Sequence, residues 1–194
     1  ILDDVFALRD MDDAADGGKV KERYNGSGAT VRGFNVEGRA AFTRWFELQA
    51  GVTLQQSRYK EPEFWSEDAE VPPVRRMFRT PDAYGYFTAS FKPVRNFTAD
   101  LSGTCTGSML VQHMAGSGVA QDVAVSTPSF FDMNIRLSYD VRIYKEITMQ
   151  LYGGVQNLFN AYQKDFDKGV DRDSGYIYGP SLPRSWFVGA KFSF

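Results

Sequence analysis

The chain has 194 residues, 43% of them hydrophobic and 15% aromatic, which is enough for one ordinary domain with a substantial core. Its 22 Lys and Arg residues nearly balance its 24 Asp and Glu residues, so the net charge of -2 gives no electrostatic reason to expect nucleic-acid binding. No segment approaches the roughly 18 apolar residues of a membrane helix, which excludes helical membrane proteins but not membrane β-barrels, whose strands alternate apolar and polar residues.

An opening strand is expected near residues 1–10. The same residues lack the basic n-region and the apolar h-region of a signal peptide. Alternation with a period of two predicts further strands in these ranges: 33–43, 46–55, 83–92, 96–111, 131–143, 146–156 and 186–194. The alternation is cleanest in 131–143, where seven odd positions are apolar and six even positions are polar. We therefore expect about eight strands along the chain.

The predicted connections between strands alternate between short and long along the chain. Short turns are expected at 43–45, 93–95 and 144–145, and long polar connections at 11–27, 59–79, 113–128 and 158–183. This layout is typical of an outer-membrane barrel, which has short turns on its periplasmic side and long loops outside.

The apolar face carries no charge in six consecutive strands, and several strands exceed the roughly 9–11 residues that cross a bilayer. Aromatic residues gather near the strand ends, as in interfacial girdles: Phe42, Trp45, Phe46, Phe91, Phe97, Tyr139, Tyr144, Trp186 and Phe194. A soluble β-sandwich also alternates, so the choice between the two rests on these features. The expected fold class is all-β, a transmembrane antiparallel β-barrel, with the only cysteine, Cys105, as a small filler on the apolar face.

Several motifs follow one another near the C-terminus. Val155 to Asn160 reads VQNLFN, Tyr176 to Pro180 reads YIYGP, Pro183 precedes Arg184, and an amphipathic strand ends in Phe194. This order resembles the C-terminus of TonB-dependent outer-membrane receptors, and it is similar to the Bacteroidetes receptors that import metal chelates and cofactors.

Gly189, Phe192 and Phe194 match the C-terminal signal that the barrel assembly machinery recognises in such proteins, although Phe187 replaces the polar residue usual two positions before the glycine. The physical reason is that an amphipathic edge strand with free backbone groups can be captured by strand addition.

The resemblance implies a barrel of the 22-stranded type with a plug domain in its lumen. Residues 1–194 are then expected to be the C-terminal part of that barrel, about eight strands, without a plug domain in this chain. It also implies a receptor in the outer membrane of a Gram-negative bacterium, importing a large scarce nutrient such as a siderophore, haem or cobalamin. The expected partners are outer-membrane lipid, the remaining barrel strands and plug, the TonB complex acting through the plug, the barrel assembly machinery and, optionally, a surface lipoprotein.

The alternative is a self-contained eight-stranded barrel with a structural or adhesive role. Such a barrel requires residues 1–9 to pair with residues 186–194, because no strand edge can stay open to lipid.

Candidate ligand contacts lie in the long connections. Trp65, Arg75 and Arg76 could hold an anionic iron chelate through charge and stacking, but they could also pack against another loop or bind lipopolysaccharide phosphates. His113, the only histidine, could touch a haem or a chelate, or be an ordinary surface residue.

An acidic stretch near the C-terminus contains Asp165, Asp167, Asp171 and Asp173. It could hold calcium, but its glycine is not where an EF-hand loop requires one, so a solvated acidic loop is expected and no metal site is assigned. With one histidine and no phosphate-binding glycine loop, the sequence contains no catalytic set, so we expect neither an enzyme nor a cofactor.

Overall fold

The computed structural model of the chain describes residues 6–11 and 20–194. Within these residues every regular element is a β-strand and every pairing between strands is antiparallel, which confirms the predicted all-β class. The strands are β1 (Phe6–Met11), β2 (Val20–Asn25), β3 (Ala29–Thr43), β4 (Phe46–Glu63), β5 (Val74–Arg76), β6 (Ala83–Phe91), β7 (Phe97–Thr106), β8 (Leu110–His113), β9 (Val123–Ser126), β10 (Phe130–Tyr144), β11 (Ile147–Gln156) and β12 (Ser185–Ser193). This part of the chain contains no helix able to cross a bilayer.

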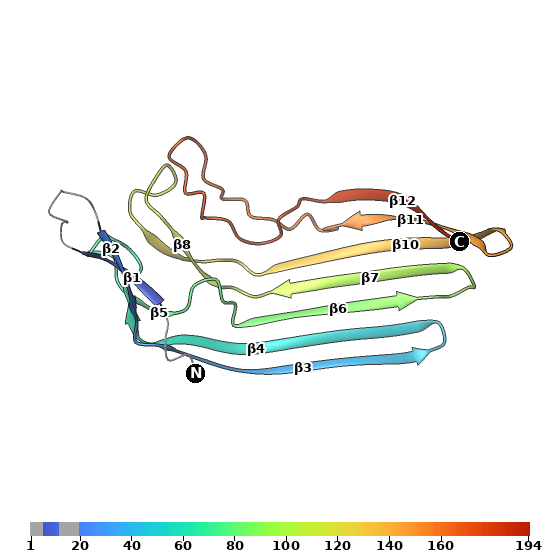
Figure 1. Ribbon diagram of the computed structural model, residues 1–194, viewed down its shortest axis with the longest axis horizontal. Helices are drawn as coiled ribbons and strands as arrows, with labels where there is room; N and C mark the ends of the chain where they lie inside the picture. Colours follow the sequence, from blue (N-terminus) through green and yellow to red (C-terminus); the bar gives the residue numbers. More distant parts are fainter. Residues whose placement is uncertain (1–5, 12–19) are drawn as a thin grey trace.

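Eight strands form the main sheet, in the order β12-β11-β10-β7-β6-β4-β3, with β5 attached to β4. The seven long strands run up and down beside one another (Figure 1), and the hairpins β1–β2 and β8–β9 are separate small sheets. Strands β3, β4 and β10 have 15, 18 and 15 residues, longer than the roughly 9–11 that a tilted strand needs to cross a bilayer.

The predicted alternation of connections is confirmed. Residues 44–45, 92–96 and 145–146 form tight connections at one end of the sheet, here called the short-turn end. The segments 64–82, 107–129 and 157–184 lie at the opposite, long-loop end (Figure 1). An up-and-down chain places alternate connections at opposite ends, so the two lengths are sorted between the two ends of the sheet.

The predicted strand 96–111 is wrong beyond Thr106. Strand β7 ends at Thr106, and the chain then enters the separate β8–β9 hairpin. Both neighbours of β7 reach their own limits there, because Thr106 pairs with Tyr84 at the start of β6 and with Phe130 at the start of β10. Beyond Gly107, whose N–H donates to Ala83 O at 2.8 Å, the chain continues the alternation but has no strand of the main sheet to pair with.

The opening strand is placed apart from the main sheet. Residues 6–11 form β1 and pair with β2, whereas residues 1–5 lie outside the described residues. In the described part of the chain, β12 pairs with β11 alone and β3 closes the other edge. The pairing of residues 1–9 with 186–194 that a self-contained barrel requires is therefore not formed by residues 6–9.

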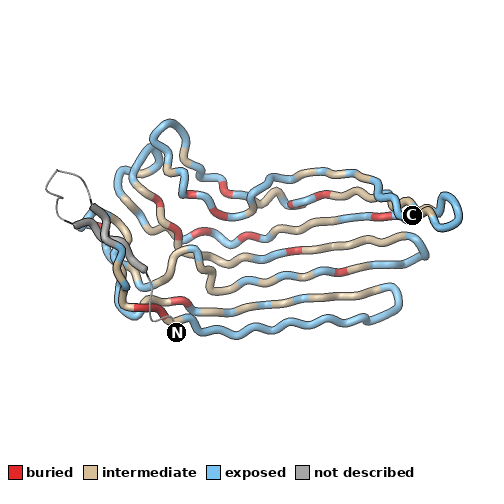
Figure 2. The backbone as a smooth tube through the Cα atoms, in the orientation of Figure 1, coloured by how far each residue is buried: buried red, intermediate tan, exposed pale blue. Residues whose placement is uncertain are grey.

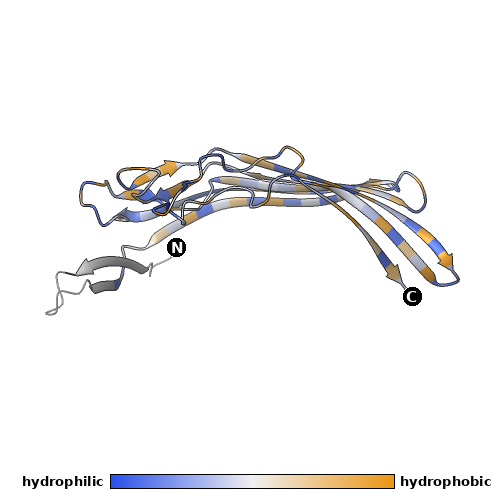
Figure 3. Cartoon of the chain, turned by 90° about the horizontal axis from the view of Figure 1, so that it is seen from above, coloured by the Kyte–Doolittle hydropathy of each residue, from blue (hydrophilic) through white to orange (hydrophobic). Residues whose placement is uncertain are grey.

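Strand register sets one apolar and one polar face. Pairing aligns one continuous row across the seven long strands: Ala40, Leu48, Ala89, Leu101, Ile135, Val155 and Trp186. One residue along, Glu47, Ser90, Asp100 and Arg136 form a polar row on the opposite face. Figure 3 shows the sheet from its side as a single curved layer in which apolar and polar residues alternate.

Both faces of the long strands remain largely accessible, and the few buried positions are scattered or gather near the long loops (Figure 2). On the apolar face, Phe34 is 67% exposed and Val188 is 90% exposed. Water-soluble monomers rarely leave so large an apolar surface uncovered. The chain therefore has a sheet whose apolar face requires a cover that the described residues do not supply.

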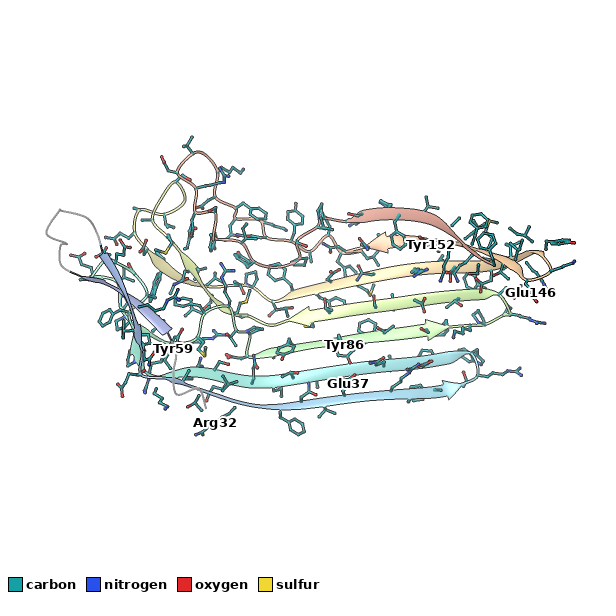
Figure 4. The ribbon with its side chains drawn as sticks, viewed as in Figure 1. Arg32, Glu37, Tyr59, Tyr86, Glu146 and Tyr152 are labelled. Atoms are coloured by element: carbon teal, nitrogen blue, oxygen red, sulfur yellow. The ribbon has the colours of Figure 1, made fainter. Side chains whose placement is uncertain are left out.

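The polar face carries hydrogen bonds between strands, one of which reaches across β4 from β6 to β3. Glu37 and Tyr86 lie on adjacent parts of it (Figure 4), and the Tyr86 hydroxyl donates to Glu37 Oε1 at 2.5 Å. Gln49 Nε2 donates to the same oxygen at 3.0 Å. The Tyr86 ring lies over Gly51, where a Cβ would be 2.7 Å from the ring, so glycine makes room for an aromatic side chain flat on the sheet.

Candidate functional site

The three segments 64–82, 107–129 and 157–184, here called the loop cluster, contact one another directly. Ser66 Oγ donates to Asp122 Oδ2 at 2.6 Å, which joins the first segment to the second. The backbone N–H of Arg79 donates to Leu110 O at 2.7 Å, and its side chain donates to Ile177 O at 2.9 Å. Arg79 therefore joins the first segment to both the second and the third.

A hydrophobic cluster lies at the long-loop end, formed mainly by the loop segments together with Phe130, the first residue of β10. Its buried members are Val111, Phe130, Tyr176 and Tyr178, with Met109, Val125 and Ala161 packed against them. Gly179 closes the turn beside them with φ +82°, and a Cβ there would lie 2.8 Å from the Phe130 ring. A residue with a side chain would be strained in this backbone conformation and would also clash, so glycine is required at position 179.

His113 is buried inside the loop cluster, so it is not the surface residue that one reading of the sequence suggested. Its Nε2 lies 3.0 Å from both carboxylate oxygens of Asp167, and its ring stacks on Tyr176 with centroids 3.7 Å apart. Burial raises the pKa of Asp167, but hydrogen bonds from the Asp173 N–H and from His113 outweigh burial and hold this pKa below its usual value. This pair connects the end of β8 to the third loop segment.

Asp165 accepts hydrogen bonds from two tyrosines. Tyr176 donates to Asp165 Oδ2 at 2.7 Å and Tyr178 donates to Oδ1 at 2.5 Å. Burial raises the pKa of Asp165, but these two donors outweigh burial, so the pKa is net lowered. Burial and the neighbouring carboxylate raise the pKa of Tyr178 to about 12 and that of Tyr176 still further. All three groups keep their ordinary charge states at neutral pH.

The acidic stretch is exposed over most of its length, as the sequence predicted, but its carboxylates also bind groups of the chain itself. Asp173 Oδ2 accepts from the Met114 N–H at 2.8 Å and Asp173 Oδ1 from the Gly175 N–H at 2.8 Å. Asp171 O accepts from the Ser117 N–H at 2.9 Å. In the described part of the chain no group of three or more His, Cys, Asp or Glu residues has a geometry that could hold a metal ion.

The other predicted ligand contacts lie in the first loop segment. Trp65 packs edge-on against Phe78, with centroids 5.3 Å apart, and its indole N–H donates to Pro72 O at 3.3 Å. Arg76 Nη2 donates to Ser108 O at 2.7 Å and lies 3.0 Å from Asp82 Oδ2. The exposed Arg75 donates to Lys60 O. His113 is thus separated from the other three, because its contacts all lie within the second and third segments.

Sequence reasoning missed the structural importance of Arg79. This residue has φ 56°, a conformation that costs a side-chain-bearing residue energy, and it makes contacts to both other segments. No local pattern marks it, because its partners lie 96 and 98 residues away in the chain.

The proposed assembly-signal residues lie on the edge strand. Gly189 is paired with Tyr152, whose ring occupies the space that a Cβ would take at 2.5 Å. Phe192 is 53% exposed on the apolar face, and Phe194 follows the last strand residue. Phe187, the departure from the usual pattern, lies near Tyr152 on the other face, with ring centroids 6.4 Å apart.

A search of protein-family models finds no match, and neither does a search of curated proteins. Among solved structures, the chain is similar to the ferric-catecholate import receptor Fiu of Escherichia coli K12 in its closed form, with a TM-score of 0.61 and 20% sequence identity. The likeness covers 94% of this chain but 22% of the receptor, so the chain spans about a fifth of that protein's length. The chain has an all-β antiparallel fold that resembles the barrel of a TonB-dependent receptor.

Proposed function

We propose that the chain is the C-terminal part, residues 1–194, of the barrel of a TonB-dependent outer-membrane receptor that imports a large scarce nutrient in a Gram-negative bacterium. The observation that carries the proposal is the charge-free apolar row across seven strands, backed by a polar face. Such a sheet, with its apolar face uncovered by the described residues, suits lipid on one side and a polar lumen on the other. The fold likeness to an import receptor supports transport rather than an enzymatic role.

The nutrient is of the siderophore, haem or cobalamin type, in keeping with the resemblance of the C-terminal motifs. Outside the chain, the proposal requires the remaining barrel strands, a plug domain, the TonB complex and the barrel assembly machinery, and it allows a surface lipoprotein. Gly189, Phe192 and Phe194 are the residues proposed to be recognised during assembly.

Within the loop cluster, Trp65 and Arg75 are the proposed contacts to an anionic chelate. Arg75 is exposed and donates to a single backbone carbonyl, which leaves guanidinium donors for a ligand. Arg76 and His113 are bound to protein groups, so their proposed effect on a ligand is to hold the loops in place.

Growth of a deletion strain on defined iron chelates, haem and cobalamin tests the transport proposal. We expect loss of growth on one of these sources, restored by the wild-type gene. Complementation with Arg75→Gln should weaken binding of that nutrient to cells about tenfold, since a charge-assisted hydrogen bond contributes about 1.5 kcal/mol. The matched control is Arg172→Gln, a loop arginine that donates to Gly169 O. Normal growth of the deletion strain on all sources would refute nutrient import.

A further inference from the structure

The short-turn end of the sheet contains a cavity that no part of the transport proposal uses. It has a volume of about 550 Å³ and lies between the turn at residues 44–45 and the turn at residues 92–96. Its lining consists of Arg44, Trp45, Lys92, Pro93, Val94, Arg95, Asn96, Phe97, Thr98 and Asp140. Asn96 has φ 79°, which turns the second connection around the cavity.

The charge of this lining is strongly positive. Arg44, Lys92 and Arg95 contribute three cations, and Asp140 is the one carboxylate. Asp140 already accepts a hydrogen bond from Gln150 at 2.9 Å. In the described part of the chain, the guanidinium groups of Arg44 and Arg95 have no hydrogen-bond or ion-pair partner. Lys92 also lies near the Glu47 carboxylate. The cavity suits an anionic group because its two guanidinium groups have no described partner.

Trp45 joins this cavity to an aromatic cluster. Its ring lies 5.8 Å from the ring of Phe91 and 6.2 Å from that of Phe46, and Phe46 stacks on Phe42 at 5.6 Å. Phe42, Phe46 and Phe91 share the apolar face at the ends of their strands. The aromatic rings lie next to the cations of the cavity. Lipids have the matching order at a membrane interface, where the acyl chains, which suit aromatic rings, lie next to the phosphates, which suit cations.

We infer that the cavity at the short-turn end binds the phosphate of an anionic phospholipid headgroup, with Arg44, Lys92 and Arg95 around the phosphate and Trp45 beside the glycerol and upper acyl chain. The inference rests on the membrane placement of the proposed function, but on no particular imported nutrient. Guanidinium groups can bind a phosphate with two hydrogen bonds each, and Lys92 adds a point charge.

The test uses the protein purified in mild detergent from its own outer membrane and stripped of lipid. Native mass spectrometry or a fluorescent-lipid titration measures the binding of phosphatidylglycerol and, separately, phosphatidylcholine. We expect phosphatidylglycerol to bind more tightly, and the variant Arg44→Gln/Lys92→Gln/Arg95→Gln to lose about a hundredfold in affinity, because each cation near an anionic surface contributes about fivefold. Raising the salt concentration should weaken wild-type binding in the same direction.

The matched control is Arg142→Gln/Lys145→Gln, which removes one cation from the end of β10 and one from the turn that follows it, neither of which lines the cavity. This control should bind phosphatidylglycerol like the wild type. If the triple variant fails to fold, the salt dependence of the wild type and its preference for phosphatidylglycerol still decide the matter.

Three outcomes would overturn the inference: equal binding of the two lipids, unchanged affinity in a folded triple variant, or complete displacement of the lipid by millimolar inorganic phosphate, which would make the occupant a free anion. These outcomes are separate from nutrient import, because a deletion strain that grows normally refutes import and leaves the lipid measurements standing.

Discussion

Truncation of Val111 tests whether the loop cluster is held by its own small core. Val111 is 0% exposed and lies among Phe130, Tyr176 and Tyr178. The Val111→Ala substitution removes two methyl groups, worth about 1.6 kcal/mol of transfer free energy at about 0.8 kcal/mol each. The remaining cavity raises the cost to about 2–3 kcal/mol. Because Val111, Tyr176 and Tyr178 belong to the loop segments and Phe130 is only the first residue of β10, this cost should fall mainly on local opening of the loops.

Amide hydrogen exchange measures that opening directly. A loss of 2–3 kcal/mol should speed exchange in residues 107–128 and 173–180 by roughly 30- to 150-fold, at 1.4 kcal/mol for each factor of ten. Exchange in β11, and in β10 beyond its first residues, should be unchanged. The control Val170→Ala alters a side chain that is 96% exposed and should leave every rate within about twofold. Equal acceleration in the loops and the sheet, or none in either, would refute a separate loop core.

Further predictions concern the sheet and the loop carboxylates. Leu101→Arg, in the middle of the apolar row, should cost about 2–4 kcal/mol of folding free energy in a bilayer and lower the folded fraction in outer membranes. The control Ser102→Arg, on the polar face, should leave the folded fraction unchanged. Equal yields of the two variants would count against the assigned faces. The pKa of Asp167 is lowered in the fold, so its stabilisation is present above the usual carboxylate pKa of about 3.9 and is lost as pH falls through the lower folded value. Loop exchange corrected for intrinsic rates should therefore accelerate below about pH 4. The Asp167→Asn variant should reduce that dependence and leave the part due to Asp165, whose pKa is also lowered. An unchanged acid profile in the variant would contradict this assignment. Gly189→Leu should displace the Tyr152 ring and so lower the temperature at which the protein unfolds. Gel electrophoresis of samples heated to increasing temperatures measures this unfolding temperature. An unaltered temperature would show that the ring does not need this space.

The sheet could be predicted from the sequence because its determinants are local. Period-two alternation assigns each residue to a face within a few positions, so the apolar members of the row at Leu48, Leu101 and Ile135 were all expected on one side. Where a strand ends depends on its neighbours. The alternation continues past Thr106, so it could not predict that β6 and β10 both begin beside this residue and offer no pairing beyond it.

The loop cluster could be predicted only in part. Residue type alone pointed to Trp65, Arg75 and Arg76 as ligand contacts. The contacts they make are to the protein itself, so their role toward a ligand stays a proposal. His113 and Asp167 are 54 residues apart in the chain, and no sequence spacing predicts that they meet. Their contact depends on the sheet bringing the second and third long segments to the same end, which is a property of topology rather than of local pattern.

The links made by Arg79 have a mechanical consequence for the loop cluster. The first segment cannot move outward without breaking its bonds to Leu110 and Ile177, and the second is joined to the third through His113 and Asp167. Displacing one segment therefore costs the hydrogen bonds that join it to the other two. We expect opening of this end of the protein to be cooperative rather than loop by loop.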